Sequence, residues 1–263
     1  MSYTASWYAS PIQLPARKHG NVEVRHRTIP VGEEVQIVGI RQAITRGVRQ
    51  VSGITQEPLL VHELVEGKTL WMTDLPEELN QIAELLYCLE PEGKVLVGGL
   101  GLGILTTAVA RFPGVMSVTT VERSASIIHL CSPHHPNVTV RHGDIADYLK
   151  TTKTKYDYIL LDTWCGTSEG TWWTDVMPLK RIVRNRWGKR PYLHCWAEDI
   201  MEGQIYRSMT NPHTRPHWYY KYLPIPMPES MAQLFLTGVG LPEWEQAFGD
   251  AVDRGLSPDA APA

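Results

Sequence analysis

Three glycines and three carboxylates are the residues of this chain whose types and spacing favour ligand chemistry. They are Gly99, Gly101, Gly103, Glu122, Asp144 and Asp162. Glycine at alternating positions lets a backbone turn sharply and approach a ligand closely. A carboxylate about 20 residues beyond such a turn is placed to accept hydrogen bonds from both hydroxyls of a ribose. The pattern therefore predicts a crevice that binds a nucleoside.

An alternation of strands and helices is needed to bring these residues together. Apolar runs typical of strands lie at Val95–Val97, Val118–Val121, Val138–Val140, Tyr156–Leu161 and Tyr192–Trp196. Helical patterns lie before, between and after them, at 73–90, 104–110, 124–130, 174–187 and 198–209. We expect Thr73 or Asp74 to cap the first helix, and Thr174 or Asp175 the fourth. Such alternation predicts an α/β domain in which the strand ends converge on one crevice.

The first 72 residues have a different character. Short aliphatic runs are punctuated by glycines every 8 to 14 positions, which predicts a small antiparallel sheet or hairpins. The segment is also locally basic, with Arg17, Lys18, Arg25, Arg27, Arg41, Arg46 and Arg49 before residue 50. A solvated sheet face and a contact with an anion or a nucleic acid both explain these charges.

The series of strand ends resembles the class I methyltransferases that use S-adenosyl-L-methionine, over roughly Thr73 to Trp196. The resemblance implies a Rossmann-like, doubly wound, mostly parallel sheet with helices on both faces. It assigns Gly99, Leu100, Gly101 and Gly103 to the cofactor loop, Glu122 to the ribose, and Asp144 with Ile145 to the adenine. Arg123, next to Glu122, is also expected to contact the cofactor, as is Asp162. Asp162 corresponds to the acid that ends the fourth strand.

The chain resembles spermidine synthases, which share this fold, at one position and departs from them at another. Val97 stands where many methyltransferases have an acid, and spermidine synthases have an apolar residue there as well. Their pattern places a second Asp three residues after the fourth-strand acid, where this chain has Cys165. A methyltransferase is the leading interpretation. Aminopropyl transfer, or a non-catalytic module that binds a nucleoside or a protein, remains the alternative.

Residues after the fourth strand are candidates for the acceptor site. Asp162 is the candidate catalytic residue, because its carboxylate is placed to orient an amine acceptor or the amino group of the cofactor; capping the next turn is the structural alternative. Trp164, Trp172 and Trp173 lie within ten residues, in a segment (163–174) that we expect to be a loop. They form either the wall of a substrate pocket or the aromatic packing of that loop.

Composition limits the partners and the compartment. The chain has 263 residues, of which 43% are hydrophobic, and a net charge of −3, which does not indicate a nucleic-acid binder although one stays possible. Its four cysteines form no CxxC pair, which favours a reduced cytoplasmic interior over a disulfide framework. We expect no membrane segment and no metal, including at the run Cys131–Pro136; an oligomer is possible, and the methyl acceptor is not identified.

The expected organisation has three parts. Residues 1–72 form the β-rich region, 73–240 the Rossmann-like cofactor-binding domain, and 241–263 a C-terminal helix and tail. The last two strands usual in the methyltransferase sheet are the hardest to place. Trp218–Leu223 and Gln233–Thr237 are the best candidates.

Overall fold

The computed structural model describes residues 2–3, 10–38, 49–164 and 171–210. The two candidate strands, the expected C-terminal helix and tail, and Cys165 lie outside these ranges, so the division at 72 and 240 stays a prediction. Spatial contacts divide the chain into two compact units. The first is Met1–Thr163 with Arg186–Trp196, and the second is Trp164–Asn185 with Ala197–Ala263.

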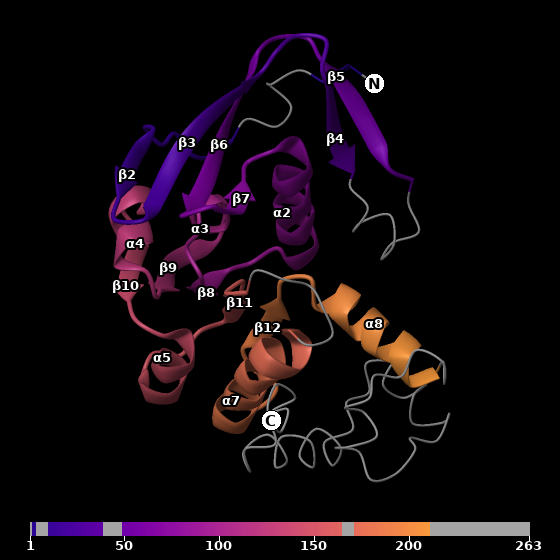
Figure 1. Cartoon of the computed structure of the whole chain (residues 1–263). Coiled ribbons are helices and arrows are strands. Elements are labelled where there is room, and N and C mark those ends of the chain that lie inside the picture. Colours follow the sequence, from indigo (N-terminus) through magenta and orange to yellow (C-terminus); the bar gives the residue numbers. More distant parts are fainter. Residues whose placement is uncertain (1, 4–9, 39–48, 165–170, 211–263) are drawn as a thin grey trace, which may run out of the picture. The chain divides into compact units, whose positions relative to one another are not determined.

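Two small sheets form the N-terminal part of the first unit (Figure 1). Strands β2 (Arg17–His19), β3 (Val22–Ile29), β6 (Leu59–Glu66) and β7 (Thr69–Thr73) make a four-stranded antiparallel sheet in the order β2-β3-β6-β7. Strands β1 (Ser2–Tyr3), β5 (Val51–Thr55) and β4 (Glu34–Val38) make a three-stranded sheet in that order. The predicted β-rich region is therefore confirmed, and it extends to the threonine at position 73.

A five-stranded parallel sheet forms the centre of the same unit. Its strands are β8 (Gly93–Gly98), β9 (Val115–Glu122), β10 (Val138–His142), β11 (Tyr158–Leu161) and β12 (Tyr192–Cys195), in the order β10-β9-β8-β11-β12. Val95, Leu96 and Val97 are fully buried, as expected for a central strand covered on both faces. The predicted mostly parallel sheet is confirmed.

The helices that follow the strands return the chain in two directions. Helices α3 (Ile104–Ala110) and α4 (Ala125–Cys131) lead outward to β9 and β10, whereas α5 (Ile145–Thr151) leads back to β11. Because parallel crossovers are right-handed, this reversal puts α5 on the opposite face from α3 and α4. The chain order changes direction between β8 and β11, which is where open α/β sheets bind ligands.

Helix α2 (Pro76–Leu89) begins differently from the prediction. Its N-cap is Leu75, which makes no side-chain capping bond. The carboxylate of Asp74 instead accepts hydrogen bonds from the backbone N–H of His62 and from its ring Nδ1, each at 2.6 Å. Both side chains are buried, so Asp74 fastens β6 to the end of β7 rather than capping the helix.

The antiparallel sheet is also tied to helix α4. The guanidinium of Arg17 on β2 donates to the carbonyl oxygens of His129 and Leu130, at 3.0 and 2.7 Å. Carbonyls at a helix C-terminus lack partners within the helix and favour a cation. Part of the basic N-terminal segment is thereby explained by internal contacts, and Arg25 and Arg27 both pair with Glu63.

Most of the described part of the second unit is helical. A π-helical turn at Trp172–Val176 runs into α7 (Met177–Trp187), and α8 (Glu198–Thr210) follows β12. The helix therefore starts before Thr174, because Trp172 and Trp173 are buried and take part in its first turn. The ammonium of Lys180 lies 4.7 Å from the centre of the Trp172 ring and 3.0 Å from Glu198. Burial raises the pKa of nearby Glu202.

We expect Asp74→Ala to lower the free energy of unfolding by about 2 to 4 kcal/mol, because it removes the two carboxylate oxygens that bind the backbone and the ring of buried His62. Asp74→Asn keeps one acceptor oxygen and should lose about half as much. Asp147→Ala, at an exposed carboxylate, is the control and should change the free energy by less than about 0.5 kcal/mol. Chemical unfolding followed by circular dichroism measures all three, and equal midpoints for the two alanine variants would contradict the role of Asp74.

Candidate functional site

The glycine loop joins β8 to α3 at the carboxyl edge of the parallel sheet. Gly99, Gly101 and Gly103 have φ angles of +88°, +52° and +80°, a conformation that favours glycine. A Cβ atom at Gly99 would overlap the carbonyl oxygen of Asp162, and one at Gly103 would lie 2.9 Å from the carbonyl oxygen of Cys131. Contacts within the protein therefore require these glycines.

Most backbone amides of the loop already have partners. The N–H of Gly99 donates to the Val121 oxygen at 2.9 Å, and that of Gly103 to the Leu100 oxygen at 2.7 Å. The N–H of Leu100 donates to Oε2 of Glu122 at 2.9 Å. Leu102 donates to the thioether sulfur of Met72. Within the described part of the chain, the amide of Gly101 has no hydrogen-bond partner.

Glu122 ends β9 and connects the loop to the next helix. Its side chain is 9% exposed, and its second oxygen accepts from the N–H of Ser124 at 2.7 Å. The backbone oxygen of Glu122 also accepts from the N–H of Gly143, which follows β10. A carboxylate has about four acceptor positions, so two of those on Glu122 remain for a ligand. Glu122 therefore has a structural role in addition to the predicted contact with a ribose.

The predicted adenine-binding turn lies after β10. Asp144 is the N-cap of α5, where its Oδ1 accepts from the N–H groups of Ala146 and Asp147 at 2.8 and 3.2 Å. Ile145 is buried, and its side chain fills the space beside Gly98 at the end of β8. The predicted turn is thus packed against the base of the glycine loop.

Arg123 lies beyond Glu122 with its side chain exposed. Its backbone oxygen is 2.9 Å from Nε2 of His142, which ends β10. This contact joins the segment after β9 to the end of β10. A role for the Arg123 side chain in cofactor binding stays a prediction.

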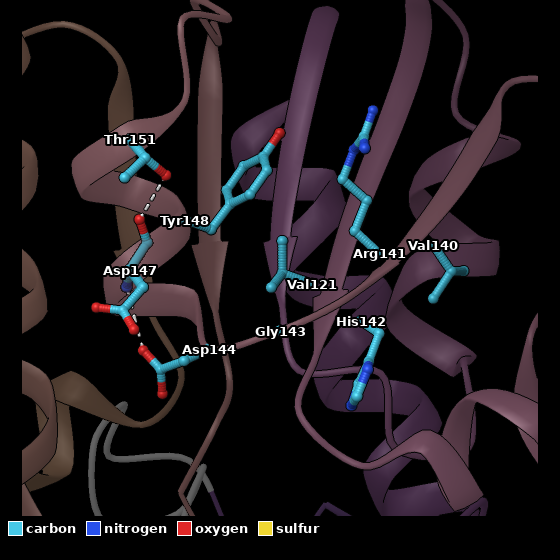
Figure 2. Close-up of a pocket in the computed structure, with 9 residues that line it drawn as sticks. All are labelled: Val121, Val140, Arg141, His142, Gly143, Asp144, Asp147, Tyr148 and Thr151. Carbon is cyan, nitrogen blue, oxygen red and sulfur yellow. Dashed lines mark hydrogen bonds between the residues drawn. The ribbon is translucent and has the colours of Figure 1, made fainter.

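A pocket of about 660 Å³ opens next to the Asp144 turn. It is lined by Val121, Val140, Arg141, His142, Gly143, Asp144, Asp147, Tyr148 and Thr151. Figure 2 shows side chains of α5 on one side and of β9 and β10 on the other. The hydroxyl of Tyr148 is 2.5 Å from that of Tyr156, and burial raises the pKa of Tyr156 to about 12, so this phenol is neutral at physiological pH.

Asp162 lies directly against the glycine loop. Its N–H donates to the Gly98 oxygen at 2.8 Å, and its own carbonyl faces Gly99 across the point where the strand order reverses. The structure thus brings Asp162 to the same edge as Glu122, although its catalytic role stays a prediction. Trp164, Trp172 and Trp173 belong to the second unit, so their predicted place in a substrate pocket stays a prediction as well.

The buried thiol of Cys131 is unsuited to nucleophilic chemistry. Burial raises its pKa to about 12; the nearby Arg17 lowers it and the Glu122 carboxylate raises it, each by less than the effect of burial. A thiol with this pKa stays protonated near neutral pH. Among the described residues, no group of three or more His, Cys, Asp or Glu side chains is arranged to hold a metal ion. The described residues include no helix long and apolar enough to span a membrane.

Met72 is a contact residue of the glycine loop that the sequence analysis missed. Its sulfur lies 3.1 Å from the nitrogen of Leu102 and occupies the space that a Cβ atom at Gly101 would need. Met72 precedes the loop by about 30 residues in a strand of another sheet. No spacing motif links two such segments, so the sequence carried no signal for this contact.

Comparisons with known proteins give matches among solved structures alone. No protein-family model and no curated protein matches the chain. Human methyltransferase-like protein 13, in complex with S-adenosylhomocysteine, is 28% identical over 30% of this chain and 40% of its own, with a TM-score of 0.25. A dimethyladenosine transferase from Plasmodium falciparum is 19% identical over 50% of this chain and 44% of its own, with a TM-score of 0.34.

A third similar structure is phosphoethanolamine N-methyltransferase 1 from Haemonchus contortus, 19% identical over 43% of this chain and 23% of its own, with a TM-score of 0.32. This chain thus spans less than half the length of each of the three. The assignment of the fold rests on the strand order, with the glycine loop after the first strand. The chain therefore has a Rossmann-like α/β fold.

We expect Glu122→Ala to lower the free energy of unfolding by about 2 to 4 kcal/mol, because it leaves two enclosed N–H donors without partners. Glu122→Gln keeps one acceptor oxygen and should lose about 1 to 2 kcal/mol. Glu92→Ala is the control, because Glu92 is an exposed carboxylate before the opposite end of the sheet. Urea unfolding measures the three variants, and a loss no larger than that of the control would show that the two bonds do not stabilise the loop.

Gly99→Ala should be much more destabilising than Gly67→Ala. Both glycines have positive φ angles, so either alanine loses roughly 1 to 2 kcal/mol to backbone strain. A Cβ atom at Gly67 meets no atom within 4 Å, whereas one at Gly99 overlaps a backbone oxygen that cannot move alone. The difference in melting temperature between the two variants measures the effect of the overlap, because the backbone strain is common to both. Equal melting temperatures would contradict the packing of Gly99 against Asp162.

Proposed function

We propose that this protein is a methyltransferase that uses S-adenosyl-L-methionine and acts on an acceptor still to be identified. The observation that carries the proposal is the bond between the Leu100 amide and the Glu122 carboxylate. In dinucleotide-binding folds, free amides of this loop and the following helix hold a pyrophosphate. Here a negative charge lies beside the loop, which disfavours a phosphate and favours a ligand that donates hydrogen bonds.

The residues present fit such a cofactor. Glu122 has two acceptor positions left for the hydroxyls of a ribose, and Oδ2 of Asp144 has no hydrogen-bond partner among the described residues. The amide of Gly101 is available to an acceptor atom of the same ligand. Glu122, Asp144 and the glycine loop would therefore hold the cofactor, with Ile145 as an apolar surface beside them.

The chemistry asks for positioning more than for acid or base catalysis. When bound, the cofactor would supply a methyl group on a positively charged sulfur, and this methyl group would pass to the acceptor by in-line displacement. Alignment of an acceptor with that group supplies most of the rate enhancement in such a reaction. In this proposal Asp162, at the same edge as Glu122, orients an amine of the acceptor or of the cofactor. Trp164, Trp172 and Trp173 are proposed as part of the acceptor site.

Calorimetric titration with S-adenosylhomocysteine tests the proposal directly. We expect saturable binding of one ligand per chain and weaker binding of decarboxylated S-adenosylmethionine. Glu122→Gln should weaken binding by about tenfold or more, because it removes a charge-assisted bond of roughly 1.5 to 3 kcal/mol.

Glu92→Ala should bind as the unmodified protein does, and thermal melts identify variants that are not folded. Preferential binding of decarboxylated S-adenosylmethionine would instead favour aminopropyl transfer. Absence of binding by the folded, unmodified chain would overturn the methyltransferase proposal.

A further inference from the structure

Met72 lies at the point where the antiparallel sheet meets the glycine loop. It is the fourth residue of β7 and is half-buried. Its sulfur accepts a hydrogen bond from the N–H of Leu102 at a nitrogen–sulfur distance of 3.1 Å. The same sulfur occupies the space that a Cβ atom at Gly101 would need. One side chain therefore contacts two consecutive residues of the loop.

The other loop amides that have partners are bound by residues of the parallel-sheet region. The amide of Gly99 donates to Val121, that of Leu100 to Glu122, and that of Gly103 to the Leu100 oxygen within the loop. Among the described residues, Met72 alone holds a loop amide from outside the parallel-sheet region. The second half of the bend, Gly101–Leu102, thus depends on a residue of the N-terminal sheet.

Met72 is itself firmly placed. It lies opposite Leu64 of β6, which is 1% exposed and belongs to the same apolar cluster as Leu100 and Leu102. Two residues later, the buried bonds between Asp74 and His62 fix the end of β7 to β6. The sulfur is therefore presented by a residue that is paired with β6 and lies two positions before the fixed end of β7.

We propose that Met72 is a positioning residue of the cofactor site, through which the N-terminal sheet holds the glycine loop in the form that binds the cofactor. This inference rests on the proposed function. A loop that is already ordered loses less conformational freedom when a ligand binds, so its affinity is higher. Met72 keeps Gly101–Leu102 ordered, and this pair includes Gly101, whose amide alone in the loop has no partner among the residues that the structure describes.

The thioether makes the role separable from simple packing. Leucine has a similar volume and fills the same apolar space, but it cannot accept a hydrogen bond. Met72→Leu therefore removes the acceptor while keeping most of the packing, and Met72→Ala removes both. Met116 on β9 offers a matched control, because its side chain is 72% exposed.

The first measurement uses the protein without ligand. Amide hydrogen exchange, followed residue by residue by NMR, should show faster exchange at Leu102 in Met72→Leu, by about three- to tenfold as expected for the loss of one weak hydrogen bond. Met72→Ala should exchange faster still, and Met116→Leu should match the unmodified protein. Unchanged exchange at Leu102 in both Met72 variants would overturn the proposal.

The second measurement is calorimetric titration of the same variants with S-adenosylhomocysteine. We expect about three- to tenfold weaker binding for Met72→Leu, a larger loss for Met72→Ala, and no change for Met116→Leu. Faster exchange with unchanged affinity would make Met72 a packing residue and overturn its role in the site. If the unmodified protein bound no ligand while Leu102 exchange responded as expected, the proposed function would fail and the contact itself would stand.

Discussion

The hydrogen bonds of the Glu122 carboxylate are the interactions on which the carboxyl edge of the parallel sheet depends. Glu122 accepts one N–H from the glycine loop and one from Ser124 at the start of α4, and its backbone oxygen accepts from Gly143. A buried charge is tolerated when donors surround it, and it becomes unfavourable when one is removed. The ends of β8, β9 and β10 are consequently fixed relative to one another through a single residue.

The parallel sheet could be predicted from the sequence because its signals are local. Each of its five strands is an apolar run that ends in a glycine, a carboxylate or a turn, and all five runs are strands in the structure. Ser124 caps α4 and Asp144 caps α5, as side chains of these types do at helix starts. The separation of strand ends by about 20 residues was enough to place Glu122 and Asp144 at one edge.

What could not be predicted depends on contacts between distant segments. Asp74 has the type and position of a helix cap, but the buried ring of His62 competes for its carboxylate and the cap is lost. Trp172 and Trp173 resemble loop residues by their Ser- and Gly-rich surroundings, yet they are buried in a helical turn. Local propensity is a weak preference in both places, and tertiary contacts override it.

The contacts of the glycine loop also limit how a ligand is recognised there. In the described structure, four of the five amides from Gly99 to Gly103 have hydrogen-bond partners. The proposed cofactor would therefore meet one amide donor and the acceptor oxygens of Glu122 and Asp144. Hydroxyl and amino groups satisfy such oxygens, whereas a phosphate would be repelled by them. The loop has the backbone form of a phosphate-binding turn, but the carboxylate beside it agrees better with the sugar or amino group of the proposed cofactor. The position of one carboxylate therefore decides between an anionic ligand and a hydrogen-bond donor in the proposed site. Glu122, at the end of β9, accepts the hydrogen bond of the Leu100 amide, which would otherwise be open to an anion.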